Sequence, residues 1–219
     1  MNRAGLLPRA AALLGLGALL FGCASREPQR DSSGLVKVVS RKPGNLFVHP
    51  SRSIDDYDDV WISEVGIAYA PKQPPMSEED AKAVGKMVHD LASEKFPVVG
   101  QLAVPGPGPC TLTLGVHLVA LEFPHAGAHN NGSGTIVLEF QDAQTGDPLV
   151  RYGQRRELGT RTASKKIGPD LERIEQTVES VLEDVGQRLR DVPVKQTGAL
   201  AGRGCSGKIG AVRRQARTS

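Results

Sequence analysis

CTLTLGVHLVALEF, residues 110–123, is the stretch that decides the fold class of this 219-residue chain. Every second side chain in its first half is apolar: Cys110, Leu112, Leu114, Val116 and Leu118. In an extended chain these side chains point to one face, and the Thr, Gly and His residues between them point to the other. The alternation predicts a strand that buries one face and leaves the other polar.

The neighbouring segments predict strands as well. A Gly- and Asn-rich loop over residues 124–134 leads to TIVLEFQ, residues 135–141, whose apolar side chains again alternate. The turn DAQTGD, residues 142–147, joins this strand to PLVRYGQRREL, residues 148–158, as a hairpin. Two upstream segments are further candidates: NLFVHP at 45–50 and DDVWISEVGIAYA at 58–70. Together they predict a mostly antiparallel sheet of about five to six strands.

Two segments carry apolar residues at helical spacing. In the first, residues 77–96, Ser77 is placed to cap the start of the helix. In the second, residues 169–190, Pro169 fits the first helical position, and one apolar stripe follows: Leu171, Ile174, Val178, Val181, Val185 and Leu189. The order of elements predicts a single α+β domain over residues 45–192, with both amphipathic helices on one face of the sheet.

Residues 1–22 have the pattern of a signal peptide. Arg3 and Arg9 precede a 12-residue apolar run over residues 10–21. Such a run extends about 18 Å as a helix, which is short of the ~30 Å hydrocarbon core that a spanning helix crosses. The segment therefore indicates secretion rather than a membrane span.

Cys23 follows this segment directly, with Gly22 before it and Leu20 three positions upstream. The pattern resembles the lipobox of bacterial lipoprotein precursors, in which the Cys becomes the first mature residue and carries the lipid. The resemblance implies that Cys23 is a lipid anchor, and Ala24 after it favours the outer membrane of a Gram-negative cell. Phe21 departs from the smaller residue that is usual there, and the alternative is an ordinary secretory signal or an uncleaved anchor.

The two ends of the mature chain differ in composition from its body. Residues 23–44 are polar with little periodicity and predict a lipidated Cys followed by a flexible tether. Of the 27 Lys and Arg residues, 2 lie in residues 1–22 and 6 in residues 192–219, which leaves 19 against all 24 acidic residues in the body. This split predicts a disordered basic tail over residues 193–219, either attracted to an anionic surface or without a partner.

Two further cysteines are present, Cys110 and Cys205. The periplasm permits a disulfide between them. Cys110 opens an apolar strand face, whereas Cys205 lies in the Gly-rich tail, so the sequence favours a buried free thiol at Cys110 and leaves pairing open.

Several of these segments together resemble a family of bacterial lipoproteins known as domain of unknown function 3313. The likeness rests on the lipobox, on SEEDAKAVGKMVHDLASEKFPVV, on the PGPG turn before CTLTLGVHLVALE and on DAQTGDPLVRY, and it covers approximately residues 33–192. It implies an envelope lipoprotein with one α+β domain, and it supplies no catalytic residue.

Three short motifs contain some of the residues that a nucleotide or metal site needs. GRGCSGKI, residues 202–209, is one residue short of a phosphate loop, but Ile209 replaces the hydroxyl that would hold magnesium, so no nucleotide is expected. His125 and His129 have a spacing that zinc sites use, without a third ligand nearby. The acidic run DDYDD, residues 55–59, lacks the ligand spacing of a calcium loop. We expect His125 and His129 to lie in a solvated loop and DDYDD to form a solvated acidic turn.

No nucleophile with a base, no cofactor motif and no metal site is evident, so no catalytic, cofactor or metal residue is assigned. The basic tail lacks the interleaved aromatics of a nucleic-acid-binding segment, and no nucleic-acid partner is expected. The sequence favours a lipid-anchored, periplasm-facing binding or assembly module, held to the membrane by Cys23, with an envelope protein or the cell wall as partner. The alternatives are an envelope hydrolase whose site is scattered in sequence, and a structural spacer between membrane and wall.

Overall fold

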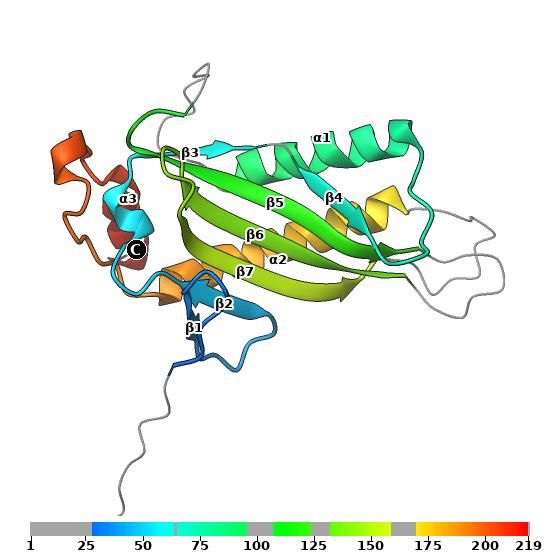
Figure 1. The fold of residues 1–219 in the computed structure, drawn as a ribbon, viewed down its shortest axis with the longest axis horizontal. Helices are drawn as coiled ribbons and strands as arrows, with labels where there is room; N and C mark the ends of the chain where they lie inside the picture. Colours follow the sequence, from blue (N-terminus) through cyan, green and yellow to red (C-terminus); the bar gives the residue numbers. More distant parts are fainter. Residues whose placement is uncertain (1–27, 64, 96–106, 124–131, 159–169, 219) are drawn as a thin grey trace, which may run out of the picture.

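The computed structural model describes residues 28–63, 65–95, 107–123, 132–158 and 170–218 (Figure 1). Within those ranges, seven strands and three helices follow one another as β1 (Val36–Val38), β2 (Asn45–Val48), β3 (Asp59–Ile62), β4 (Gly66–Tyr69), α1 (Glu78–Lys95), β5 (Thr111–Glu122), β6 (Ser133–Asp142), β7 (Pro148–Glu157), α2 (Leu171–Asp191) and α3 (Lys208–Thr218). Two 3-10 turns are also present, η1 (Ile54–Asp56) and η2 (Ala201–Arg203). The α+β class is confirmed, and the sheet has seven strands where about five to six are predicted.

All the strands belong to one sheet. Its order is β1-β2-β7-β6-β5-β3, and β4 pairs with β5 as well. The pairs from β1 to β5 are antiparallel, whereas β3 and β4 follow one another along the free edge of β5 and run parallel to it. A parallel connection needs a crossover, and α1, between β4 and β5, supplies it. The sheet is therefore mostly antiparallel with one parallel edge.

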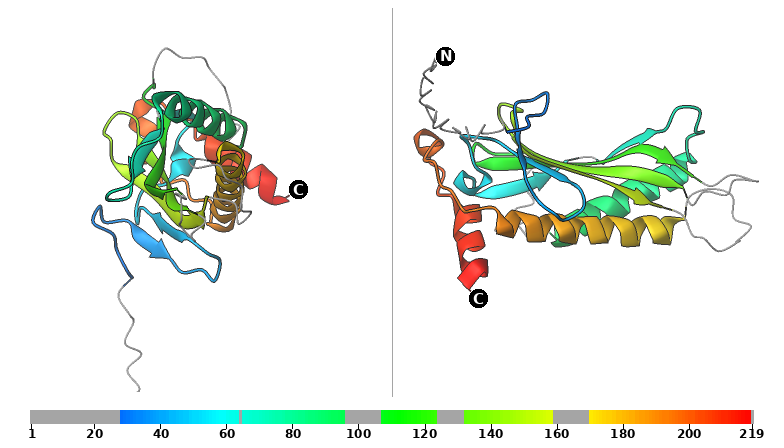
Figure 2. Two further views of the ribbon diagram at one scale, coloured as in Figure 1. Left: turned by 90° about the vertical axis from the view of Figure 1, so that its right-hand side faces the viewer. Right: turned by 90° about the horizontal axis from the view of Figure 1, so that it is seen from below.

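The core lies between one face of the sheet and two helices. Leu112, Leu114 and Val116 of β5 are fully buried, as the alternation in the sequence predicts. Ile174 and Val178 of α2 are fully buried in the same hydrophobic cluster. Figure 2 shows α1 and α2 side by side over this face of the sheet. The opposite side of the sheet, which we call the outer face, has neither helix over it.

Side-chain caps fix the starts of both helices. The Ser77 hydroxyl accepts a hydrogen bond from the Asp80 N–H at 3.0 Å, so the predicted cap of α1 is confirmed. Asp170 caps α2, because its carboxylate accepts from the Arg173 N–H at 3.1 Å. Pro169, predicted at the first helical position, precedes this cap and lies outside the described residues. Over the described part of the chain, none of the helices combines the length and apolar character that crossing a bilayer demands.

The structure differs from the flexible tether predicted over residues 23–44. Arg30 forms an antiparallel bridge with Val36, and β1 follows directly. Asp31 forms an ion pair with Arg151 on β7 at 2.7 Å. From Gln29 on, the predicted tether thus belongs to the folded domain. A strand of three residues is too short to show a period in the sequence, which is why this part is not predicted.

The structure also differs from the disordered basic tail predicted over residues 193–219. Its described part forms η2 and α3, and α3 lies beside η1 at one end of the sheet (Figure 1). The domain therefore continues past residue 192, its predicted end.

Candidate functional site

The acidic turn at residues 55–59 holds the C-terminal segment. Asp55 and Asp56 are buried, with exposed fractions of 0% and 6%. The Asp55 carboxylate accepts a hydrogen bond from the Lys195 N–H at 2.8 Å, and that of Asp56 accepts one from the Thr197 N–H at 2.8 Å. The expected solvated acidic turn is therefore wrong at these two residues, because their carboxylates satisfy backbone donors of another segment.

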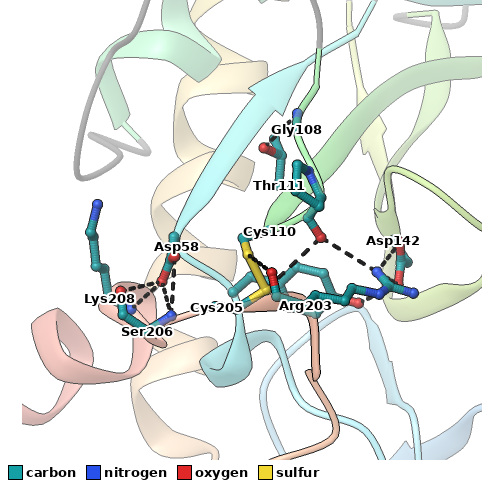
Figure 3. Close-up of a disulfide and its surroundings, with 11 residues drawn as sticks. Asp58, Gly108, Cys110, Thr111, Asp142, Arg203, Cys205, Ser206 and Lys208 are labelled. Atoms are coloured by element: carbon teal, nitrogen blue, oxygen red, sulfur yellow. Dashed lines mark hydrogen bonds and ion pairs between the residues drawn. A yellow bond between two sulfur atoms is a disulfide. The ribbon is translucent and has the colours of Figure 1, made fainter. Parts of the chain in front are cut away.

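Asp58 in the same turn lies at the N-terminus of α3. Its carboxylate accepts hydrogen bonds from the N–H groups of Ser206 at 3.0 Å and Lys208 at 3.1 Å (Figure 3). Burial alone would raise the pKa of Asp58, but these hydrogen bonds outweigh it and lower that pKa. The free N–H groups at the start of a helix attract anions. The helix end that GRGCSGKI, residues 202–209, would offer to a phosphate thus holds an aspartate of the same chain.

Arg213 of α3 connects the C-terminal helix to both η1 and α2. Its guanidinium forms an ion pair with Asp55, and the two side chains are only 12% and 0% exposed. It also donates hydrogen bonds to the backbone carbonyls of Leu189 and Val192. Carbonyls at a helix C-terminus lack partners within the helix, and a cation satisfies them well. One arginine of the basic tail therefore closes the end of α2 and neutralises a buried acid.

Asp142, the last residue of β6, has a second set of partners. Its carboxylate accepts hydrogen bonds from Arg52 at 2.6 Å, Tyr57 at 2.9 Å and Arg203 at 2.9 Å. Burial would raise the pKa of Asp142, but hydrogen bonds from the Gln144 backbone, Tyr57 and Arg203 outweigh it and lower that pKa. Burial, together with the bond to Asp142, raises the pKa of Tyr57 to about 12. We call the following set of contacts the C-terminal clamp: those of Asp55, Asp56, Asp58 and Asp142 with residues 195–213.

A disulfide between Cys110 and Cys205 closes the clamp covalently (Figure 3). It connects the residue before β5 to the segment between η2 and α3, over a sequence separation of 95. The free thiol expected at Cys110 is therefore wrong. One feature of the sequence could have indicated this contact. The body of the chain is acidic and its C-terminal end is basic, and two such parts of one chain attract each other.

Acid is expected to weaken the clamp. Because the pKa values of Asp58 and Asp142 lie below the ~3.9 of a free carboxyl, the stability they contribute is complete above about pH 4 and is lost as the pH falls through the lower folded values. The urea midpoint of the protein should drop on acidification below about pH 4, and it should drop less in Asp142→Asn. Glu79→Gln, which changes an exposed carboxyl on α1, should follow the wild type. An identical drop in Asp142→Asn and wild type would contradict this assignment.

The outer face is a different region, formed by side chains that point away from α1 and α2. In Figure 1 neither α1 nor α2 lies in front of it across β5, β6 and β7. The strand register brings its side chains together in two rows: Trp61, Thr113 and Gln141, then Gly115, Glu139 and Arg151. Trp61 is the single tryptophan of the chain and is 42% exposed. The face thus combines aromatic, polar and charged groups, and among the described residues neither α1 nor α2 covers it.

Arg151 borders this face on the β7 side. Its guanidinium forms ion pairs with Glu139 of β6 and with Asp31 of the N-terminal segment. Burial alone would raise the pKa of Asp31, but hydrogen bonds from Ser33 and the Leu35 backbone, together with the charge of Arg151, outweigh it and lower that pKa. The N-terminal segment is therefore held at β7, away from the row that contains the tryptophan.

His117 lies on the outer face against two glycines. A Cβ atom on Gly115 would stand 2.8 Å from His117 Nε2, and one on Gly66 would clash with Nδ1. The absence of these side chains lets the imidazole lie close to the backbone of the sheet. The sequence predicts an exposed His117 on the polar face of its strand, and the structure places it on that face, half-buried.

The remaining candidates from the sequence are Cys23, His125 and His129, and all three lie outside the described residues. Within the described ranges, no group of three or more His, Cys, Asp or Glu side chains is arranged to hold a metal ion.

The fold and these two regions define an α+β protein with a one-sided sheet and a disulfide-closed C-terminal segment. No protein-family model and no curated protein sequence matches the chain. A PelC dodecamer from Paraburkholderia phytofirmans is similar in structure at a TM-score of 0.38 and 11% identity, over 66% of this chain and 96% of that chain. A neuraminyllactose-binding hemagglutinin homolog from Helicobacter pylori is similar at a TM-score of 0.34, 11% identity, and 78% and 97% coverage. Neither similarity is close enough to carry a functional assignment.

Proposed function

We propose that this chain is a lipid-anchored, periplasm-facing lipoprotein of the Gram-negative outer membrane that acts as a binding or assembly module, and that it belongs to the lipoprotein family that its sequence resembles. Cys23 is the anchor, and the outer face of the sheet contacts an envelope protein or the cell wall. The observation that carries this proposal is the outer face, because it presents Trp61, 42% exposed, in one row with Thr113 and Gln141.

The disulfide supports the location. Structural disulfides persist in oxidising compartments such as the periplasm and are rare in the cytosol. The Cys110–Cys205 bridge closes the clamp on which the C-terminal segment depends, so the fold itself favours such a compartment. The signal peptide predicted over residues 1–22 would deliver the chain there.

The chemistry of the outer face supports a binding role. Tryptophan is enriched at the energetic centres of interfaces, and Trp61 lies on this face with 42% of its surface exposed. Thr113 and Gln141 stand in the same row as Trp61 and provide hydrogen-bonding groups beside it. A partner that covered this row would bury the ring of Trp61 and contact polar groups around it. Specific protein interfaces have such an apolar centre and polar rim.

Trp61→Ala is expected to lower the yield of the bound partner by about tenfold or more, because truncating a central tryptophan costs about 2 kcal/mol or more of binding. Trp61→Phe, which keeps an aromatic ring, should lose less. The measurement is affinity purification of the full-length protein from membranes, with copurified envelope proteins and wall fragments quantified by mass spectrometry. Equal yields for Trp61→Ala and the wild type, at equal folding stability, would count against the outer face as the binding surface.

The anchor has its own test. The intact mass of the protein from the membrane fraction should correspond to a chain that begins at Cys23 and carries acyl groups. Cys23→Ala should lack the acyl mass and leave the membrane fraction. A mature chain that retains residues 1–22, or one that keeps Cys23 without acyl mass, would refute the anchor.

A further inference from the structure

The turn between β1 and β2 carries an exposed apolar side chain among basic ones. Val39 is 96% exposed. Arg41 and Lys42 follow it, and both are exposed. We call residues 39–42 the β1–β2 tip. A single exposed valine is common on protein surfaces, so its position relative to the rest of the chain decides what it can do.

The N-terminal chain leaves the domain toward this tip. The Gln29 carbonyl accepts a hydrogen bond from the Lys37 N–H at 2.8 Å, and the bridge between Arg30 and Val36 is antiparallel. In an antiparallel pair, going back along the chain from Arg30 follows the direction in which β1 runs toward Val39. Figure 1 and the left view of Figure 2 show the start of the described chain and this hairpin on the same side of the molecule.

The chain between the anchor and the domain is short. Only six residue steps separate Cys23 from Gln29. Fully extended, they span about 20 Å at most, and a flexible chain of that length spans about 13 Å on average. Val39 lies two residues beyond Lys37, the partner of Gln29, which is about 7 Å along the strand. An anchored Cys23 therefore keeps the tip within reach of the bilayer surface.

The charges around the tip suit an anionic surface. Arg30 and Lys37 add to Arg41 and Lys42 on this side of the domain. Asp31 pairs with Arg151, and Asp191 pairs with Lys42 at 3.0 Å. Arg30, Lys37 and Arg41 therefore remain as the basic residues in excess. Each Lys or Arg close to an anionic membrane strengthens the contact by about fivefold.

We infer that the β1–β2 tip is a second membrane contact, in which Val39 enters the headgroup region of the bilayer and Arg41 meets its anionic lipids. The inference rests on the proposed anchor at Cys23. The two contacts together fix the orientation of the domain, because one flexible attachment alone would let it turn freely.

The test uses the full-length lipidated protein in vesicles, with Trp61→Phe present so that one introduced tryptophan is the sole reporter. Val39→Trp places the reporter at the tip, and Ala83→Trp places it at an exposed position of α1, on the far side of the domain in Figure 1. In vesicles of phosphatidylglycerol and phosphatidylethanolamine with brominated acyl chains, emission from position 39 should be quenched and emission from position 83 should not. Adding Arg41→Gln should weaken the contact by about fivefold, and only in anionic vesicles.

Equal quenching at positions 39 and 83, or no quenching at either, would overturn the tip contact. The acyl mass of each preparation separates this failure from failure of the anchor. Protein that carries the acyl mass and shows no quenching at position 39 overturns the tip contact alone. Protein without the acyl mass overturns both.

Discussion

Breaking the Cys110–Cys205 disulfide is expected to lower the free energy of unfolding by about 4–5 kcal/mol. The bridge spans a sequence separation of 95, and a cross-link over a loop of that length removes much of the conformational freedom of the unfolded chain. The same bridge holds the C-terminal segment beside the carboxylates of the clamp, so its loss also weakens their contacts. Urea unfolding with and without a reductant measures the change.

The double variant Cys110→Ser/Cys205→Ser is the matched control. It should show the same decrease as the reduced wild type, and the reductant should have no further effect on it. A decrease of less than about 1 kcal/mol in the double variant would mean that the bridge contributes little to the fold.

Arg213→Ala is expected to have the next largest effect, a loss of about 3–5 kcal/mol in the free energy of unfolding. The substitution leaves the fully buried Asp55 carboxylate without its cation, and it leaves the carbonyls of Leu189 and Val192 without a donor. Removing one member of a buried ion pair costs far more than removing an exposed charge.

Two further variants make this prediction specific. Arg213→Lys keeps the positive charge but lacks the planar guanidinium, which donates to several acceptors at once. The free energy of unfolding of this variant should therefore lie between those of the wild type and Arg213→Ala. Arg214→Ala removes the exposed neighbour on the same helix and should leave the urea midpoint unchanged. Equal losses for Arg213→Ala and Arg214→Ala would show that general charge, and not the clamp, stabilises the C-terminal segment.

The strands of the sheet and the two helices packed on it could be predicted, because an element buried on one side has apolar residues at a regular spacing. Leu112, Leu114 and Val116 are apolar because they face the helices, and the stripe containing Ile174 and Val178 is apolar because it faces the sheet. Each of these patterns can be recognised within one short segment. The parallel edge formed by β3 and β4 is not visible in this way, because strand direction depends on which strand is the neighbour.

The clamp could not be predicted because its partners are far apart and not periodic. Asp55 and Arg213 are separated by 158 positions, and each lies in a charged stretch that is typical of a solvated surface when taken alone. Cys110 and Cys205 are also far apart in the sequence, with a separation of 95, and no local pattern connects them. The contrast between the acidic body and the basic end was the available signal, and it indicated an attraction without identifying the partner within the chain.

The outer face was anticipated only as the polar side of β5. The sequence placed His117 there, but it did not show that Trp61 would stand beside Thr113, because that contact depends on the parallel register between β3 and β5. The strand register places Trp61, Thr113 and Gln141, which are far apart in the sequence, side by side on one face of the sheet.

Site-specific photo-crosslinking in living cells tests whether the outer face contacts a partner in the envelope. A photoreactive residue at Thr113 probes the outer face, and one at Ala83 probes the exposed side of α1, each in the full-length anchored protein. A contact at the outer face predicts a discrete crosslinked species from position 113 that is lost in Trp61→Ala and is absent from position 83. Crosslinks of equal yield from both positions, or a species that forms only from position 83, would contradict it.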